Sequence, residues 1–342
     1  MDENSPLILD ATDSTPQPEA KAPEQRFLVL PHLLVLVVIL IGLFSSVLVP
    51  RTVALLSSSS VPNTVPNTIN LSDRIEQKAI PKLDAIDLRA EAAFVWDVAG
   101  QRSLLQKNAD QVKPLASLTK LMTALVAYEL VPNETTVTIS SIAANQQSGG
   151  TLRSGERFSI KPLADFALVS SFNSAAYALA DSVGAKLGDG QAVSNFVTAM
   201  NIQAERLNLP TLRFLNPTGL DVSTDEAGAY GSARDVTFLL EYILRNHPDI
   251  LLPTITPRMR LYNQVGEYHE ANNTNELLGV VPNLLGSKTG YTDLSGGNLT
   301  LVFDVGFNRP VIITVLGSTR SERFADVAAL VRAVQAAALI NE

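Results

Sequence analysis

Ser117-Leu118-Thr119-Lys120 begins a run in which apolar residues recur at the spacing of an α-helix. The apolar positions of this run are Leu118, Leu121, Met122, Leu125 and Val126. Such a stripe is typical of a helix with one buried face, so we predict a helix from Ser117 to Leu130. The three-residue spacing of Ser117 and Lys120 places their side chains within reach of each other. A serine becomes a nucleophile when a nearby base takes its proton, and lysine is such a base only if its pKa is lowered.

Ser117 also fits a second interpretation, because serine is a frequent helix N-cap. The two motifs described next favour the nucleophile. Histidine is not a candidate base for this serine. His32 lies in an apolar segment near the amino terminus, and His247 and His269 lack the Ser and Asp context of a Ser-His-Asp triad.

A second motif, Ser171-Phe172-Asn173, lies between two apolar segments that we predict to be helical. A polar Ser and Asn in a loop between two buried helices can point into a cleft. There Ser171 can relay a proton and Asn173 can hold a substrate amide. The alternative is simple loop capping, which Ser and Asn do well.

The third motif, Lys288-Thr289-Gly290, precedes the last predicted strands, and we expect it on a sheet edge. Gly290 then allows a ligand backbone to approach closely. Lys288 supplies a cation for a substrate carboxylate or for the electrostatics of the site, and Thr289 or Thr292 supplies a hydroxyl. We expect an oxyanion hole from two backbone N–H groups, one at Ser117 and one near Tyr291.

The chain has 342 residues, and from Ala79 onward its pattern predicts one mixed α+β domain. The expected strands are Glu91–Asp97, Arg102–Gln106, Asn298–Val305 and Pro310–Leu316, and the further expected helices are Asp165–Leu179, Val193–Leu207 and Ala325–Ile340. A hairpin at the start and strands at the end, with helices between, predict an antiparallel sheet built from both ends of the domain.

The amino-terminal part has a different composition. Residues 1–26 are polar and hold six carboxylates against two basic residues, so we predict a disordered leader. Residues 27–49 contain no charge, and as a helix they span roughly 35 Å, enough for a bilayer core of about 30 Å. A signal peptide has a basic start and a shorter apolar stretch, so we predict a retained transmembrane helix. Residues 50–79, rich in Ser, Pro and Asn, predict a flexible linker to a catalytic domain at 80–342.

Charge predicts the orientation of this anchor and excludes some partners. Lys21 and Arg26 precede the apolar segment and Arg51 alone follows it closely, so the amino terminus is expected in the cytoplasm. The protein is then a single-pass membrane protein, held in the bilayer by residues 27–49, with its domain outside the cytoplasm. The net charge of −8 and the lack of a basic block give no support for nucleic-acid binding. We see no metal-ligand cluster or phosphate-binding glycine loop, and therefore expect no cofactor.

With the three motifs in this order, the segment from about residue 80 to 342 resembles the low-molecular-mass penicillin-binding proteins. These are serine-type D-Ala-D-Ala carboxypeptidases of peptidase family S11. Further matching segments are Lys107–Asp110, Pro114–Ser117, Asn216–Asp221, Ser232–Asp235, Asn273–Asn275 and Gly286–Thr292. The resemblance implies a β-lactamase/transpeptidase-like fold, in which an antiparallel sheet is flanked by helices and carries a helical subdomain.

The resemblance also implies roles for individual residues. Ser117 is the acylated nucleophile and Lys120 its base. The other implied site residues are Ser171 and Asn173 of the second motif, Lys288, Thr289, Gly290 and Thr292 around the third, and Arg320 for the terminal carboxylate. The implied substrate is a peptidoglycan stem peptide ending in D-Ala-D-Ala, and β-lactam antibiotics are the implied covalent inhibitors.

The sequence departs from the family pattern at Phe172, where a small residue is usual, and at Ser174, where Asp is frequent. We also expect no β-rich second domain and no carboxyl-terminal anchor of the kind found in many relatives. Three alternatives stay open: a β-lactamase-like hydrolase, a D,D-endopeptidase of the same fold, and a catalytically silent wall-binding protein. The β-lactamase needs a glutamate in a Glu-x-x-Leu-Asn loop, and Glu205–Asn208 is one residue short of it.

Overall fold

The computed structural model describes residues 83–340, except residue 307. The predicted leader (1–26), transmembrane helix (27–49) and linker (50–79) therefore lie outside the described residues. Within the described part, no helix is both long enough and apolar enough to cross a membrane.

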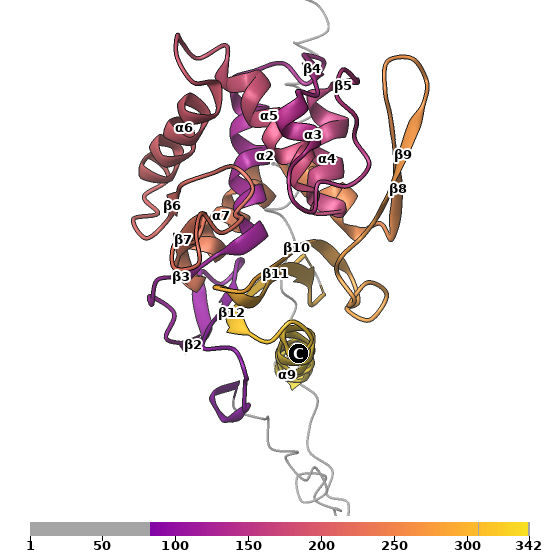
Figure 1. Ribbon diagram of the computed structural model, residues 1–342. Coiled ribbons are helices and arrows are strands. Elements are labelled where there is room, and N and C mark those ends of the chain that lie inside the picture. Colours follow the sequence, from indigo (N-terminus) through magenta and orange to yellow (C-terminus); the bar gives the residue numbers. More distant parts are fainter. Residues whose placement is uncertain (1–82, 307, 341–342) are drawn as a thin grey trace, which may run out of the picture. The chain divides into compact units, whose positions relative to one another are not determined.

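A five-stranded antiparallel sheet forms the centre of the domain, with the strand order β10-β11-β12-β1-β2 (Figure 1). Its strands are β1 (Ala92–Asp97), β2 (Arg102–Lys107), β10 (Leu284–Thr292), β11 (Gly296–Asp304) and β12 (Pro310–Ser318). The first strand of the domain pairs with the last one, β12, in antiparallel register. The predicted sheet built from both ends of the domain is thus confirmed, and β10 is an edge strand.

Both faces of this sheet carry buried residues, and along β1, β11 and β12 alternate residues pack into different cores. On β1, Phe94 faces the helical side whereas Val95 packs toward the carboxyl-terminal helix α9 (Glu322–Ile340). On the opposite face, α7 (Ala233–Asn246) lies against β1 and β12. The result is a sheet between helical layers, as Figure 1 shows, with the cores on its two faces separated by the sheet itself.

A lobe of helices stands above the helical face of the sheet. Its members are α2 (Thr119–Leu130), α3 (Ser141–Ala144), α4 (Ile160–Val169), α5 (Asn173–Gly184) and α6 (Ala192–Arg206). The predicted helix Val193–Leu207 is confirmed, and so is the predicted loop at the second motif, which divides the helical span Asp165–Leu179 into two helices. Residues Ser170–Phe172 separate α4 from α5, because Ser171 has the left-handed φ of 62° that an α-helix cannot contain.

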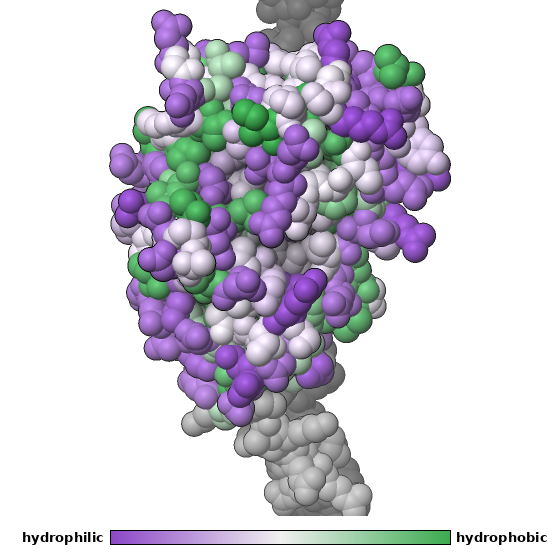
Figure 2. Space-filling view, in the orientation of Figure 1, coloured by the Kyte–Doolittle hydropathy of each residue, from purple (hydrophilic) through white to green (hydrophobic). Residues whose placement is uncertain are grey.

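Short elements connect these parts. They are η2 (Leu83–Ala85), β3 (Lys113–Pro114), η3 (Ala116–Leu118), β4 (Thr136–Thr138), β5 (Arg157–Ser159), β6 (Arg213–Phe214), β7 (Ala229–Gly231), α8 (Pro248–Leu251), η4 (Leu252–Ile255), β8 (Arg258–Tyr262) and β9 (Tyr268–Asn272). The β8–β9 hairpin projects beside the helical lobe, and its side of the view in Figure 2 is mostly hydrophilic. Apolar surface in that view gathers instead over the helical lobe.

Candidate active site

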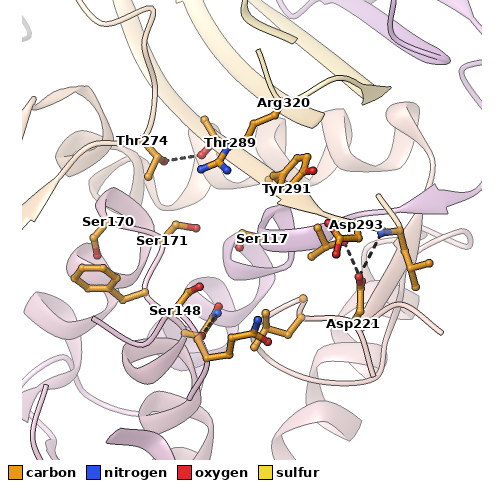
Figure 3. A pocket seen from close by; sticks show the side chains of 18 of the residues that line it. Ser117, Ser148, Ser170, Ser171, Asp221, Thr274, Thr289, Tyr291, Asp293 and Arg320 are labelled. Carbon is orange, nitrogen blue, oxygen red and sulfur yellow. Dashed lines mark hydrogen bonds between the residues drawn. The ribbon is translucent and has the colours of Figure 1, made fainter. Parts of the chain in front are cut away.

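A cleft of about 930 Å³ opens where the helical lobe meets the edge strand β10. Its walls come from the turn that carries Ser117, the α4–α5 loop, residues 147–150, residues 219–224 and residues 273–276. Ser117 and Ser171 face the same space, with Tyr291 and Arg320 on one side of it and Ser148 on the other (Figure 3). The three sequence motifs thus meet in one cleft, although the chain separates them widely.

Ser117 lies in the 3-10 turn η3, directly before helix α2. The residue that caps α2 is Leu118, with no side-chain cap, so the N-cap interpretation of Ser117 is wrong. The residue before the serine, Ala116, has a left-handed φ of 47°. Strained backbone of this kind is often found at functional sites, where the surrounding fold holds it. Gly219 supports the turn, because a Cβ there would lie 1.9 Å from the carbonyl oxygen of Ala116.

The ammonium nitrogen of Lys120 has three close contacts. Its Nζ lies 2.8 Å from Ser117 Oγ, 2.7 Å from Asn173 Oδ1 and 2.8 Å from the carbonyl oxygen of Thr218. The amide oxygen and the carbonyl oxygen only accept hydrogen bonds, so they use two N–H groups of the lysine. The third contact is the one at which a neutral amine can accept the serine proton. The geometry is therefore that of a nucleophile with its base.

Burial favours the neutral form of the Lys120 amine. Lys120 is 1% exposed, and burial together with the charge of Lys288 holds its pKa well below the ordinary value. Desolvation and a nearby like charge both disfavour the charged form of a lysine. The lowered pKa that a lysine base requires is thus a property of this position.

Lys288 forms a second serine–lysine pair, with Ser171. Its Nζ donates to Ser171 Oγ at 2.8 Å and to the carbonyl oxygen of Thr289 at 2.9 Å. Burial, and then the charge of Arg323, lower its pKa to about 7. The side chain is 1% exposed and is not among those that line the cleft. The structure therefore places this cation behind Ser171, whose hydroxyl separates it from the cleft.

Asn173 is the first residue of α5 and connects the base to a cleft wall. Its Oδ1 accepts from Lys120, while its Nδ2 donates to the carbonyl oxygen of Gln147 at 2.6 Å. Its backbone N–H donates to the carbonyl oxygen of Ser148 at 3.3 Å. Residues 147–150 thus fix the orientation of the asparagine and, through it, of the lysine.

The two departures from the family pattern have structural roles in the same place. Phe172 packs against Phe166 of α4, with ring centroids 5.3 Å apart and ring planes tilted by 60°, and also lines the cleft. Ser174 is buried, and its hydroxyl donates to the carbonyl oxygen of Gly149. Both side chains therefore hold the loop at 147–150 against α5.

Strand β10 forms the opposite wall. Thr289 Oγ1 lies 2.5 Å from Thr274 Oγ1, and Thr292 Oγ1 donates to Asp221 Oδ1 at 2.9 Å. Gly290 lines the cleft, as its predicted role requires, and it also meets a second steric requirement. A Cβ there would lie 2.9 Å from the carbonyl oxygen of Leu115, so the glycine admits the protein's own nucleophile turn. This close contact brings β10 next to Ser117.

Two arginines line the cleft at the start of α9. Arg320 lies over the ring of Tyr291, 5.3 Å from its centroid. Arg323 is 7% exposed, donates to the carbonyl oxygen of Gly290 at 2.6 Å, and has a buried Nε without a hydrogen-bond partner among the described residues. Burial lowers the pKa of Arg323 to about 10, which leaves it charged at neutral pH.

Arg320 was predicted from the sequence, whereas Arg323 was not. One signal was present, because a basic residue in the first turn of a helix opposes the helix dipole and is unusual there. We found no group of side chains in the described part of the chain that could hold a metal ion.

Comparison with known proteins places this arrangement in a family. Residues 77–320 match the family model of the D-alanyl-D-alanine carboxypeptidases, peptidase S11. A D-alanyl-D-alanine endopeptidase of Pseudomonas aeruginosa is 32% identical over 254 residues, which cover 72% of this chain and 77% of that protein. The D-alanyl-D-alanine carboxypeptidase DacF of Bacillus subtilis is 29% identical over 244 residues, covering 70% of this chain but 60% of the relative.

Solved structures agree with this assignment. Penicillin-binding protein D2 of Listeria monocytogenes, in its cefotaxime-bound form, matches with a TM-score of 0.61 and 30% identity, over 72% of this chain and 98% of that one. A mutant DD-transpeptidase of Streptomyces K15 matches with a TM-score of 0.65 and 25% identity, over the same shares. The chain therefore belongs to the D-alanyl-D-alanine carboxypeptidase family, peptidase S11.

Proposed function

We propose that the protein removes the terminal D-alanine from peptidoglycan stem peptides through an acyl-enzyme on Ser117. The observation that carries this proposal is the contact of Ser117 Oγ with Lys120 Nζ at 2.8 Å, in a buried site where the pKa of the lysine is lowered. A nucleophile in contact with a base that is itself oriented by a third group, here Asn173, is the arrangement that acyl transfer requires.

The reaction follows from this geometry. Ser117 Oγ attacks the carbonyl carbon between the two D-alanines, and its proton passes to Lys120. Backbone N–H groups of Ser117 and Tyr291 stabilise the oxyanion. The C–N bond then breaks, the leaving D-alanine nitrogen takes up a proton by way of Lys120 or Ser171, and water later hydrolyses the ester to restore Ser117.

The terminal carboxylate of the substrate is received, in our proposal, by Arg323 with Arg320 and Thr289. Support comes from the buried Nε of Arg323, which has no hydrogen-bond partner in the part of the chain that the structure describes, and from the position of both arginines along the cleft. Lys288 acts through Ser171 and through the charge that it adds to the site. A β-lactam carboxylate would occupy the same cations, and the similar Listeria structure, penicillin-binding protein D2 in its cefotaxime-bound form, supports β-lactam binding.

A second candidate activity is cleavage of D,D cross-links, because the Pseudomonas relative is named an endopeptidase. The two activities differ in the group that follows the scissile bond, a free D-alanine or a cross-linked residue. The class A β-lactamase alternative loses support, because Glu205 lies on α6 and does not line the cleft.

The proposed location is the outer side of the cell membrane, with residues 27–49 as the anchor and residues 80–342 outside the cytoplasm. It rests on the sequence pattern and on a substrate that exists outside the cytoplasm. Protease added to intact, wall-stripped cells should release an active fragment by cleavage between residues 57 and 66. A fragment that forms only after lysis would contradict this orientation.

The activity is tested by gel labelling with a fluorescent penicillin and by release of D-alanine from a peptide ending in D-Ala-D-Ala. Ser117→Ala should abolish both, a loss on the order of 10⁴-fold or more. Near-normal D-alanine release by this variant would rule out the acyl-enzyme. A parallel assay on a cross-linked peptide dimer separates the carboxypeptidase from the endopeptidase.

A further inference from the structure

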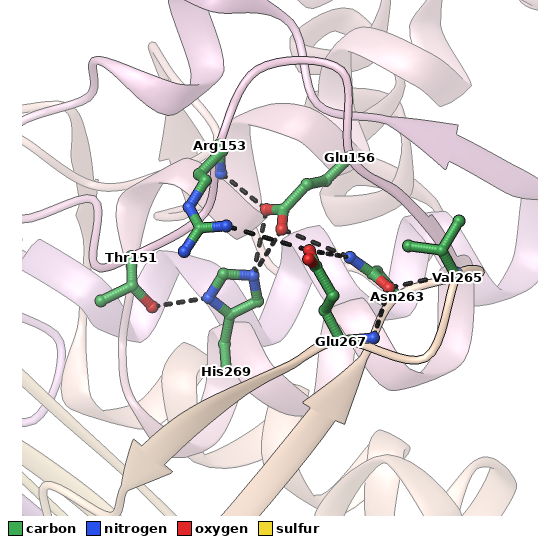
Figure 4. Close-up of polar contacts among 7 residues, drawn as sticks. All are labelled: Thr151, Arg153, Glu156, Asn263, Val265, Glu267 and His269. Atoms are coloured by element: carbon green, nitrogen blue, oxygen red, sulfur yellow. Dashed lines mark hydrogen bonds and ion pairs between the residues drawn. The ribbon is translucent and has the colours of Figure 1, made fainter.

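A second group of polar side chains lies beside the cleft, outside the residues assigned above (Figure 4). At its centre is His269 of β9, which is 6% exposed. Its Nε2 lies 2.9 and 3.0 Å from the two carboxylate oxygens of Glu156, and its Nδ1 lies 2.8 Å from Thr151 Oγ1. A carboxylate only accepts hydrogen bonds, so Nε2 carries a proton, and Nδ1 is left to the threonine hydroxyl.

Glu156 is held in place from several directions. The backbone N–H of Arg153 donates to its carboxylate at 2.7 Å, and Asn263 Nδ2 lies 3.4 Å from it. Burial acts to raise the pKa of Glu156, but the hydrogen bonds from Arg153 and His269 outweigh it and lower the pKa. The carboxylate therefore stays charged, and the imidazole has a fixed anionic partner.

The histidine connects two parts of the cleft wall. Thr151 directly follows residues 147–150, whose carbonyl oxygens hold Asn173 and thereby Lys120. On the other side, β9 continues into Asn273 and Thr274, which line the cleft next to Thr289. The Thr151–His269 contact thus joins the wall that orients the base to the wall that carries β10.

We propose that Thr151, His269 and Glu156 form a positioning tie that fixes the loop at residues 147–150, and so orients Asn173 and Lys120 for acylation of Ser117. The proposal rests on the proposed function. None of the three side chains touches the reacting atoms, so their effect passes through the loop. A loosened loop leaves the cleft present but lets Asn173 turn, which slows acylation more than it weakens substrate binding.

The most specific test is the pair Thr151→Val and Thr151→Ser. Thr151 is exposed, so both variants should fold, and only the valine loses the hydroxyl. We expect Thr151→Val to slow both penicillin acylation and kcat on a D-Ala-D-Ala peptide roughly 3- to 10-fold, with KM changed by less than about twofold. Thr151→Ser should recover a rate within about twofold of the unsubstituted protein.

His269→Gln should cost more, roughly 10- to 100-fold in the acylation rate, because it removes the imidazole that contacts both Thr151 and Glu156. The matched control is His247→Gln. His247 also contacts a glutamate, Glu129, at 3.2 Å, but this pair lines a separate pocket. The control should acylate at the rate of the unsubstituted protein.

The outcomes separate this inference from the proposed function. If the unsubstituted protein is not labelled by penicillin, the acyl-enzyme itself fails, and the tie with it. If it is labelled and Thr151→Val acylates at the same rate, the tie alone is refuted. Equal losses in the valine and serine variants, or a loss that parallels a lower unfolding midpoint, would also refute it. Thr151→Val tests the tie by itself, so the proposal remains testable even if His269→Gln misfolds.

Discussion

Two serine–lysine pairs lie at the cleft, with similar geometry but with very different separations along the chain. In each pair the lysine Nζ lies 2.8 Å from the serine Oγ, and in each the lysine is 1% exposed. Ser117 and Lys120 are three residues apart, whereas 117 residues separate Ser171 from Lys288. The first pair is a product of helix geometry, and the second exists only because β10 packs against the α4–α5 loop.

The pairs also differ in what surrounds the lysine. Lys120 contacts two further acceptors, Asn173 Oδ1 and the carbonyl oxygen of Thr218. The serine of this pair, Ser117, is the proposed nucleophile. Lys288 contacts one further acceptor, the carbonyl oxygen of Thr289. Burial is the larger cause of the lowered pKa of both lysines, and the charge of Arg323 adds to it at Lys288 as the charge of Lys288 does at Lys120. The three cations therefore form a series in which each charge affects the pKa of the next.

The largest expected effect is at the first pair. Lys120→Met removes the base but keeps much of the side-chain volume, and general-base catalysis contributes typically about 10²–10⁴-fold. We expect a loss of this size in the rate of penicillin acylation, measured by time-resolved gel labelling. Far-ultraviolet circular dichroism of the variant provides the control for folding. Acylation at more than a tenth of the normal rate would show that Lys120 is not the base.

The effect of replacing Arg323 should depend on whether the peptide substrate has a free carboxyl terminus. Arg323→Met should lower kcat/KM for a peptide with a free carboxyl terminus roughly 10- to 100-fold, since a charge-assisted hydrogen bond is lost. The same peptide with an amidated terminus should lose much less. Arg320→Met is the matched comparison, and we expect a smaller loss because Arg320 is exposed and lies over Tyr291. Equal losses on the acid and the amide would refute carboxylate binding by Arg323.

Coupling between the pairs predicts a shift with pH. Acylation needs neutral Lys120, and the charge of Lys288 lowers the pKa of Lys120. In Lys288→Met this charge is absent, so the pKa of Lys120 rises and the neutral amine forms only at higher pH. The acid limb of the acylation rate against pH should therefore move to higher pH. The effect should be largest below about pH 7, where Lys288 itself is charged. An unchanged acid limb would mean that the two lysines are not coupled.

The contrast between local contacts and contacts made by distant residues also explains which parts of the fold the sequence predicts. Strands β1, β2, β11 and β12 were predicted to within about two residues, and in β1, β11 and β12 the reason is that their apolar residues fill two cores in regular alternation. The β8–β9 hairpin was not predicted, because its outward positions are Arg, Glu and Tyr and its strands are short. A hairpin with so few apolar residues has no hydrophobic alternation in its sequence that would identify its strands.

The site follows the same rule. The contact of Ser117 with Lys120 was predictable because both residues lie on one turn of helix. The contact of Ser171 with Lys288, the placement of Arg323 and the tie at His269 all join residues far apart in the chain. Their motifs could be recognised as a set, but which atoms meet depends on the packing of the lobe on the sheet.

The smallest expected effect concerns the backbone of the two pairs. In the first pair the left-handed residue is Ala116, before the serine, whereas in the second it is Ser171 itself, with φ of 62°. Ser171→Ala and Ser171→Gly both remove the hydroxyl that accepts from Lys288, so they should slow acylation equally, by roughly 10-fold. Only glycine adopts this φ without steric cost. The free energy of unfolding of the glycine variant should therefore exceed that of the alanine variant by on the order of 1 kcal/mol. Denaturant unfolding of the two variants measures this difference, and an alanine variant as stable as the glycine one would show that the loop carries no strain at Ser171.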